Sequence, residues 1–439
     1  MAKTDPTREP LPAALPDPLP DPLPIRTRGP LDAELRVPGS RSVTNRALMA
    51  AGLARGTSRL VGATEGDDTR AMREGMRSLG AGITVEADAW VVEGTQGRPR
   101  APGVPIDVGA SGTTARFLTA AATLADGPVT VDGTARMRER PIADLVEALS
   151  ALGAGGQILG NVGCPPVRMA GGGLPGGPAS IDASRSSQYV SGILLAAPYA
   201  GQDVELRFRD GVLVSRSFVD LTLDVMASFG AEAGWVDGGV RVKAGARYSG
   251  RTYPIEPDAQ SAVYGFAAAA ISGGRVRVPG IPDHSRQTDL RVLDALCAMG
   301  CRVERLADAV EVSGPERLRG IDVDMNEIPD AVLALAVVAL FAKEPSVLRN
   351  IAHLRIKESD RLAALETELQ RLGGRATASA DTLHIEPAPL HGATIETYDD
   401  HRMAMALALA GLRVPGVAIH DPGCVDKTWP GYFQALERL

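Results

Sequence analysis

Apolar and polar positions along this chain repeat with a period of roughly seventy residues. Five amphipathic segments end in a sequence of the Leu-Gly-Ala type, and alternating apolar and polar residues follow each of them. A glycine placed in this way is typical of a helix C-terminus that leads into a strand. The pattern therefore predicts five helix ends, at Gly80, Gly153, Gly230, Gly300 and Gly373.

A second series of predicted helices starts between these glycines. Each start consists of small or polar residues, and the Ala-rich segment after it is apolar nearly all round, which is typical of an inner helix. The amphipathic segments, such as 70–79 and 363–372, should lie outside the inner helices. The predicted starts are 40–42, 111–113, 186–188, 260–261, 328–330 and 400–402.

These starts predict repeated units of the order strand, helix, strand, helix, strand, strand, the last one cut short at Leu439. A unit of this size cannot hold a core alone, so we expect an α/β fold of two similar domains, each with three βαβαββ units and parallel inner helices. The polar starts of each group should gather on one side. Two prolines within 253–257 mark a boundary. We expect residues 25–39 plus 255–439 as one domain, closed by N- and C-terminal segments, and 40–254 as an inserted domain.

Residues 1–24 are rich in proline, and Asp-Pro-Leu-Pro occurs twice in them. The segment has no apolar core of a secretory signal, and its acidic residues do not fit a transit peptide. We expect an extended, disordered tail.

Composition excludes several classes of protein. With 439 residues and 44% hydrophobic positions the chain can form a large core, and its net charge of −7 gives a nucleic-acid role no support. The apolar stretch 331–342 is too short to span a membrane and predicts one buried helix. Four scattered cysteines suit neither a disulfide framework nor a zinc site, so we expect a reducing cytoplasm. They are Cys164, Cys297, Cys301 and Cys424.

The candidate chemistry centres on residues 354–362, read together with 399–402. Leucines at helical spacing predict a helix that begins at Lys357, which would place Lys357 and Arg361 one above the other with Glu358 beside them. Two cations at a helix N-terminus favour anion binding. A solvated basic face with Glu358 as counter-ion is the alternative. The spacing is that of Leu362, Leu365 and Leu369.

Other helix starts carry possible anion-binding groups. Residues 38–46 supply two hydroxyls and two cations, and residues 186–188 supply three neutral hydrogen-bonding groups. Ordinary capping by serine explains both equally well. The glycine-rich stretch 109–116 lacks the ending of a P-loop and the spacing of a dinucleotide fingerprint.

Two further features have two interpretations each, and Lys427 stands out by composition. Arg136, Arg138 and Arg140 lie at period two, so they share one side if the chain is extended there, as a binding group or as a solvated edge. Asp330 is either an N-cap or a base with a raised pKa. Lys427 is one of only five lysines, which suggests that an ammonium group is needed there.

Seven segments, taken together and in order from about Leu31 to the C-terminus, closely resemble the 5-enolpyruvylshikimate-3-phosphate synthase family of enolpyruvyl transferases. The resemblance implies transfer of the enolpyruvyl group of phosphoenolpyruvate to the 5-hydroxyl of shikimate 3-phosphate, without cofactor or metal. It also implies an inside-out α/β barrel in each domain, with the active site in the cleft between the domains. The segments are 38–48, 136–141, 186–188, 328–330, 357–362, 400–405 and 424–428.

The same resemblance assigns the site residues. It implies that Glu358 is the proton donor, that Asp330 is the base or orients the hydroxyl, and that Lys357 helps. Substrate-binding residues are implied at Arg41, Ser42, Arg46, Gly112, Arg136, Ser186, Ser187, Gln188, Ser215, Asp330, His353, Lys357, Arg361, His401, Arg402 and Lys427.

The chain departs from the family pattern at four positions. Arg41 stands where the family usually has Lys, Ala110 and His353 replace usual Asn residues, and Phe218 replaces a usual Tyr. The acid, the base and the arginines remain, so we expect the reaction class to be kept, in a cytoplasmic monomer. The rival hypotheses are the sister enolpyruvyl transferase for UDP-N-acetylglucosamine, whose Pro-Gly-Gly-Cys loop is missing here, and a non-catalytic anion-binding scaffold.

Overall fold

The computed structural model describes residues 15–439 and divides the chain into two compact units. Unit 1 contains the described residues up to Val37, Gln260–Asp283 and Asp289–Leu439. Unit 2 contains Pro38–Ala259 and the short segment His284–Thr288. Nothing in the sequence pattern predicted that His284–Thr288 belongs to unit 2.

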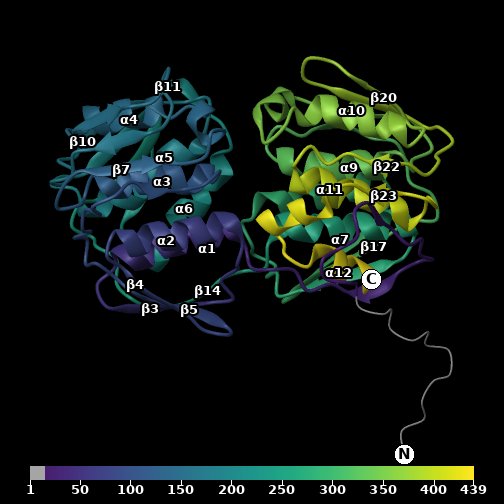
Figure 1. The fold of residues 1–439 in the computed structure, drawn as a ribbon, viewed down its shortest axis with the longest axis horizontal. Coiled ribbons are helices and arrows are strands. Elements are labelled where there is room, and N and C mark those ends of the chain that lie inside the picture. The colour runs from purple at the N-terminus through teal and green to yellow at the C-terminus, as the bar shows by residue number, and fades with distance from the viewer. Residues whose placement is uncertain (1–14) are drawn as a thin grey trace, which may run out of the picture. The chain divides into compact units, whose positions relative to one another are not determined.

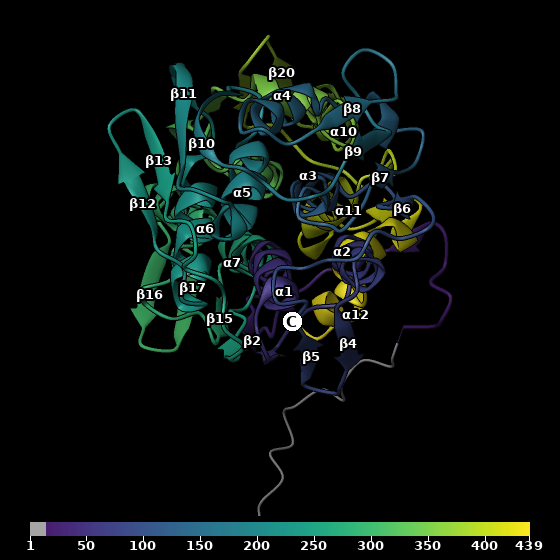
Figure 2. The same ribbon diagram turned by 90° about the vertical axis from the view of Figure 1, so that its left-hand side faces the viewer.

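Unit 2 consists of a helical centre surrounded by sheets (Figures 1 and 2). Its helices pack in a ring from α1 to α6, in which each contacts the next, and α1, α3 and α5 also contact one another. Figure 2 shows these helices along their axes. The inner helices are buried nearly all round, as their Ala-rich sequences predicted. The helices are α1 (Arg41–Leu53), α2 (Asp67–Ser78), α3 (Gly112–Ala122), α4 (Ala143–Ala151), α5 (Ser187–Ala196) and α6 (Arg216–Ser228).

Three four-stranded sheets belong to unit 2, one for each predicted repeat. Each sheet begins with a parallel pair, and its other pairs are antiparallel. The first has the order β14 (Thr252–Pro254), β3 (Thr57–Val61), β5 (Ala89–Glu93), β4 (Gly82–Val85). The second is β6 (Ile106–Asp107), β7 (Val129–Asp132), β9 (Val167–Met169), β8 (Gly156–Ile158), and the third β10 (Gly177–Ala183), β11 (Val204–Leu213), β13 (Gly239–Val242), β12 (Ala233–Val236).

Unit 1 repeats this plan with two four-stranded sheets and one of three strands. The sheets are β16 (Arg302–Leu306), β17 (Ala309–Ser313), β15 (Arg275–Pro279), β2 (Asp32–Glu34); then β18 (Asp322–Asp324), β19 (Ser346–Arg349), β21 (Leu383–Glu386), β20 (Arg375–Ala378); and β1 (Leu23–Pro24), β23 (Ala418–Ile419), β22 (Thr394–Ile395). Its helices are α7 (Ala259–Ser272), α8 (Val292–Ala298), α9 (Val332–Ala339), α10 (Arg361–Arg371), α11 (His401–Ala408) and α12 (Tyr432–Glu437).

Local sequence explains both ends of the helices. The five predicted glycines all have φ between +87° and +102°, the left-handed conformation that glycine adopts without strain. Ser40, Ser111, Ser186 and Asp400 each accept a backbone N–H as N-caps. The stretch 331–342 contains the predicted buried helix, α9, at Val332–Ala339. The last repeat is shortened, as its three-stranded sheet shows.

The predicted tail needs one correction. Residues 1–14 lie outside the described part of the chain, but Leu23 and Pro24 form β1 and pair with β23. Leu23 is 2% exposed, so the ordered chain begins before residue 25 because an apolar side chain enters the core.

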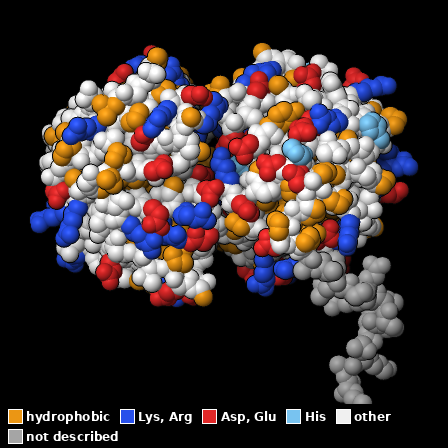
Figure 3. All heavy atoms as spheres, viewed as in Figure 1, with side chains coloured by type: hydrophobic (Ala, Val, Ile, Leu, Met, Phe, Trp, Pro, Cys, Tyr) orange, Lys and Arg blue, Asp and Glu red, His pale blue; other side chains and the backbone are white. Residues whose placement is uncertain are grey.

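Charged side chains of both signs are interspersed over the face of each unit that Figure 3 shows. No helix in residues 15–439 combines the length and apolar character that a membrane crossing needs.

Candidate active site

Helix starts converge in unit 1, as the repeat predicted. Asp330 lies in a 3-10 turn (Pro329–Ala331) directly before α9, Arg402 is the second residue of α11, and Gln260 lies at the start of α7. The Asp330 carboxylate lies 3.1 Å from Arg402 and 3.0 Å from Arg361, and it accepts a hydrogen bond from Gln260 Nε2 at 3.1 Å. Four segments far apart in the sequence therefore meet at one carboxylate.

Arg361 is the most fully paired side chain of this cluster. Its guanidinium contacts Asp400 at 2.7 Å, Glu358 at 2.9 Å and Asp330 at 3.0 Å, and it is 1% exposed. Burial alone would lower the pKa of Arg361, but the three carboxylates raise it above its usual value. For Arg402 burial is likewise outweighed, chiefly by Asp330, so that its pKa is raised too. Both arginines are held in their charged forms.

Asp330 is ionised in this environment. Burial alone would raise its pKa, but Arg402, Lys357 and Arg361 outweigh burial and lower the pKa well below its usual range. The raised pKa considered from the sequence is therefore wrong. The capping alternative is also wrong, because the side chain makes no capping hydrogen bond and faces cations instead.

Lys357 and Glu358 do not begin a helix, in contrast to the prediction. They lie between a 3-10 turn (Ala352–Ile356) and α10, which starts at Arg361. Asp360 caps α10 by accepting the backbone N–H of Ala363 at 3.0 Å, and this cap delays the helix start. Lys357 and Arg361 are therefore not stacked on one helix face.

Glu358 nevertheless remains beside two cations. Its carboxylate contacts Arg361 on one side and Lys427 Nζ, at 3.4 Å, on the other. Lys427 ends a 3-10 segment (Pro422–Lys427) that packs against α11. The structure thus brings together an acid, three cations and the ionised Asp330, all named from the sequence.

Two histidines border this cluster. Burial and the charge of Lys357 lower the pKa of His353 to about 4, although Asp330 opposes the change. Its Nε2 is buried without a partner in the described part of the chain. His401 is 1% exposed and its Nδ1 lies 3.8 Å from Asp400.

In unit 2 the predicted residues at the start of α1 are held by protein groups. Arg41 forms an ion pair with Asp68 at 2.9 Å. Arg46 is 2% exposed and donates to Thr222 Oγ1, Ser191 Oγ and the carbonyls of Ser42 and Phe218. Burial lowers the pKa of Arg46 to about 9.

The glycine-rich loop is tied to α5 and to two arginines. Gln188 Nε2 donates to Thr113 Oγ1 at 3.1 Å, which joins the starts of α5 and α3. A Cβ at Gly112 would lie 2.7 Å from Arg140 Nη2 and 2.9 Å from Arg116 Nη1. A side chain at position 112 would therefore displace one or both guanidinium groups.

The three arginines at period two do not share one side. Residues 137–139 form a 3-10 turn, and Arg136 pairs with Glu139 across it at 2.8 Å. Arg138 pairs with Asp132, and Arg140 donates to the carbonyl of Ala110. The extended conformation considered from the sequence is therefore wrong, but the interpretation as solvated side chains holds for Arg136 and Arg138, which are 52% and 55% exposed.

The predicted serines lie at helix starts. Ser186 caps α5, with Ser187 as the first residue of that helix, and Ser42 is the second residue of α1. Ser215 precedes α6 with φ of +52°, an uncommon conformation for a residue with a side chain and one that clusters at functional sites.

The sequence analysis assigned no individual function to some residues of these clusters. Asp400 is fully buried and binds Arg361 through both carboxylate oxygens, but only the motif around it drew attention. Gln260 and Arg116 likewise appeared only within longer segments, and Arg140 was named only as one of three arginines at period two. Partners so distant in sequence leave no local signal that would reveal them.

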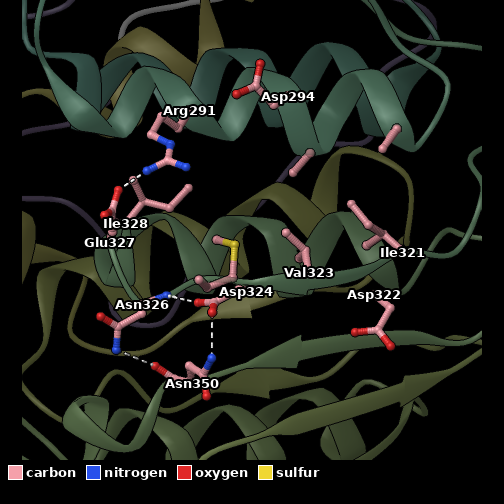
Figure 4. A pocket seen from close by; sticks show the side chains of 13 residues that line it. Arg291, Asp294, Ile321, Asp322, Val323, Asp324, Asn326, Glu327, Ile328 and Asn350 are labelled. Atoms are coloured by element: carbon pink, nitrogen blue, oxygen red, sulfur yellow. Dashed lines mark hydrogen bonds and ion pairs between the residues drawn. The ribbon is translucent and has the colours of Figure 1, made fainter.

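A separate groove of about 590 Å³ lies in unit 1 between α8 and β18 (Figure 4). None of the predicted site residues lines it. Four carboxylates border it against one arginine, Arg291, which pairs with Glu327. An excess of negative charge disfavours an anionic substrate there. Within residues 15–439, no three His, Cys, Asp or Glu side chains are grouped as metal ligands would be.

Two units of three repeats with inner helices define an enolpyruvyl transferase architecture. The solved enolpyruvyl transferase NikO from Streptomyces tendae shares this fold, with a TM-score of 0.77 at 19% identity over 96% of this chain and 98% of that chain. A solved EPSP synthase from Acinetobacter baumannii has a TM-score of 0.82 at 27% identity, covering 94% and 97% of the two chains. The predicted fold class is confirmed.

The family model for EPSP synthase (3-phosphoshikimate 1-carboxyvinyltransferase) matches residues 25–436, so the chain belongs to this family. A 3-phosphoshikimate 1-carboxyvinyltransferase of Nostoc punctiforme is 45% identical over 92% of this chain and 95% of its own length. Another, from Methanoculleus marisnigri, is 47% identical over 94% and 98%. The resemblance read from the sequence is confirmed, and the sister enzyme for the nucleotide sugar is set aside.

Proposed function

We propose that the charged cluster of unit 1 and the helix starts of unit 2 carry out the activity of the family, 3-phosphoshikimate 1-carboxyvinyltransferase. The enolpyruvyl group of phosphoenolpyruvate passes to the 5-hydroxyl of shikimate 3-phosphate and phosphate leaves, as a step of the shikimate pathway. The observation that carries this proposal is the convergence of an acid, Glu358, with Asp330 and three cations at one place in unit 1.

The reaction needs a proton donor and a group that receives or orients a proton. Addition protonates C3 of the enol ether while the 5-hydroxyl loses its proton. We assign the donor role to Glu358, which Arg361 and Lys427 hold between them. Asp330 orients the hydroxyl or accepts its proton as a carboxylate, since Arg402 and Arg361 keep it ionised, and Lys357 assists.

The cations have a second role. Phosphoenolpyruvate carries a carboxylate and a phosphate, and Arg361, Arg402 and Lys427 supply charge to bind them and to stabilise the departing phosphate. Before substrate binds, the three face Asp330, Glu358 and Asp400, so an anionic ligand must compete with these carboxylates. From unit 2 we assign substrate contacts to Arg136, Gly112, the start of α1 and the start of α5.

Phosphate release tests the proposal. Purified protein incubated with shikimate 3-phosphate and phosphoenolpyruvate should release phosphate, and each substrate alone should not. Turnover with UDP-N-acetylglucosamine in place of shikimate 3-phosphate would favour the sister enzyme. No phosphate release with either acceptor would favour the non-catalytic scaffold.

We also propose a cytoplasmic monomer. The four cysteines are unpaired, as a reducing compartment would keep them. Light scattering coupled to size-exclusion chromatography measures the assembly state directly, and a mass of about twice 45.8 kDa would contradict the monomer.

A further inference from the structure

Two arginines without carboxylate partners flank the first turn of α3. Arg116 Nη1 donates to the Gly112 carbonyl at 3.0 Å, and its Nη2 donates to the Pro141 carbonyl at 2.8 Å. Arg140 Nη1 donates to the Ala110 carbonyl at 3.1 Å. Across residues 15–439 neither arginine has a carboxylate within ion-pair distance. In this part of the chain, no carboxylate therefore balances the two positive charges.

The two guanidinium groups lie in the space that a side chain at position 112 would occupy. A Cβ placed there would lie within 3.0 Å of a nitrogen of each. Like charges so close repel each other. Burial, and then the charge of Arg140, lower the pKa of Arg116 to about 10. An anion beside Gly112 would relieve this repulsion.

The two arginines also have unused hydrogen-bond donors. Arg116 is 3% exposed, and its Nε has no hydrogen-bond partner in the described part of the chain. Within that same part, Arg140 uses only Nη1, so its Nε and Nη2 remain available. A buried donor without a partner is uncommon in proteins. The N-terminus of α3 adds partial positive charge at the same point.

We propose that Arg140 is a further binding residue for phosphoenolpyruvate, and that it reserves the space beside Gly112 for an anionic group. Arg116 is a positioning residue, because it is buried and fixes the carbonyls of Gly112 and Pro141. The inference rests on the proposed function, which supplies the anion. Both substrates carry a phosphate group, so the experiment must separate them.

A purely structural role for Arg140 would be to fix the loop through the Ala110 carbonyl. The variants Arg140→Gln and Arg140→Lys distinguish binding from loop fixation. Arg138→Gln is the matched control, because Arg138 belongs to the same segment but pairs with Asp132 on the surface. The measurements are kcat, KM for each substrate with the other saturating, and Tm.

We expect Arg140→Gln to raise KM for phosphoenolpyruvate about 10-fold or more, the effect of one lost charge-assisted hydrogen bond. KM for shikimate 3-phosphate and Tm should remain near wild type. Arg140→Lys should give a smaller rise, since an ammonium keeps the charge but loses the planar fork. Arg138→Gln should match wild type in every measurement.

Three results would overturn the inference. An unchanged KM for phosphoenolpyruvate in Arg140→Gln removes Arg140 from the site. A parallel rise of both KM values with a lower Tm assigns it to loop fixation, and a selective rise for shikimate 3-phosphate assigns it to the other substrate.

Failure of the proposed function would look different, because the wild type itself would release no phosphate. In that case the role of Arg140 is tested by the rise in Tm that inorganic phosphate produces in wild type and in Arg140→Gln. Equal rises for wild type and Arg140→Gln would overturn the role of Arg140, and a rise lost only in the variant would support it.

Discussion

Buried arginines of the two units differ in what they are paired with. In unit 1, Arg361 and Arg402 face carboxylates, which raise their pKa despite burial. In unit 2, Arg46 and Arg116 are paired with carbonyls, hydroxyls and aromatic rings, and burial lowers their pKa to about 9 and about 10. Buried arginine is thus paired with carboxylates in unit 1 and with neutral groups in unit 2, and its pKa is shifted in opposite directions.

This contrast suggests that the unit 1 residues serve proton transfer and the unit 2 arginines serve anion binding. The unit 1 cluster is nearly balanced in charge, which keeps Asp330 and Glu358 beside cations where proton transfer needs them. Arg116 and Arg140 of unit 2 have no carboxylate partner in the described part of the chain, and their positive charge favours an incoming anion. Variants of Glu358 in unit 1 should therefore lower kcat, and variants of Arg140 in unit 2 should raise KM for phosphoenolpyruvate.

The largest expected effect is on the acid of unit 1. Glu358→Gln removes the proton donor but keeps the size of the side chain, so kcat should fall about 10²-fold or more. Glu74→Gln is a suitable control, because Glu74 pairs with Arg77 on the surface of α2. Near-wild-type turnover of Glu358→Gln would remove Glu358 from the mechanism.

The second largest effect is expected on stability, when the buried ion pair between Asp400 and Arg361 is broken. Asp400→Asn leaves Arg361 with two of its three carboxylates, and we expect the free energy of unfolding to fall by about 3 kcal/mol. Asp88→Asn removes a partner of exposed Arg59 and should cost less than about 1 kcal/mol. Urea denaturation measures both. Equal losses would show that the unit 1 pairing is no stronger than a surface pair.

A smaller effect should appear in the pH dependence of stability. Since the folded pKa of His353 is about 4, below its unfolded value, the unfolded state binds the extra proton first as pH falls. The stability that His353 contributes is therefore complete above roughly pH 6.5 and is lost as pH falls toward 4. His353→Asn should reduce the drop in Tm over this range. A drop identical to that of the wild type would contradict the lowered pKa of His353.

The smallest effect is expected at the start of α1. Arg41→Lys keeps the charge that pairs with Asp68 and restores the residue usual in the family, so activity should equal or exceed wild type. Steady-state kinetics with both substrates checks this expectation. A large loss would show that the site has adapted to a guanidinium group at this position.

Much of the fold was predictable because it depends on local signals. Glycines at helix ends and serines at helix starts act within a few residues, and these recur along the chain at repeat spacing. The start of α10 shows the limit of such reasoning. Leucine spacing suggested a helix from Lys357, but the capping side chain of Asp360 decided where the helix begins.

The candidate site was predictable as a set of residues through its motifs, but not as a set of contacts. Sequence alone determined the six repeats, the inner and outer helices and the resemblance to the family. Only the tertiary structure decided that Arg361 is shared by three carboxylates, that Asp330 is ionised and that Arg140 lies against Gly112. The physical reason is that ionisation and ion pairing depend on distances between segments far apart in the chain, which no local pattern records.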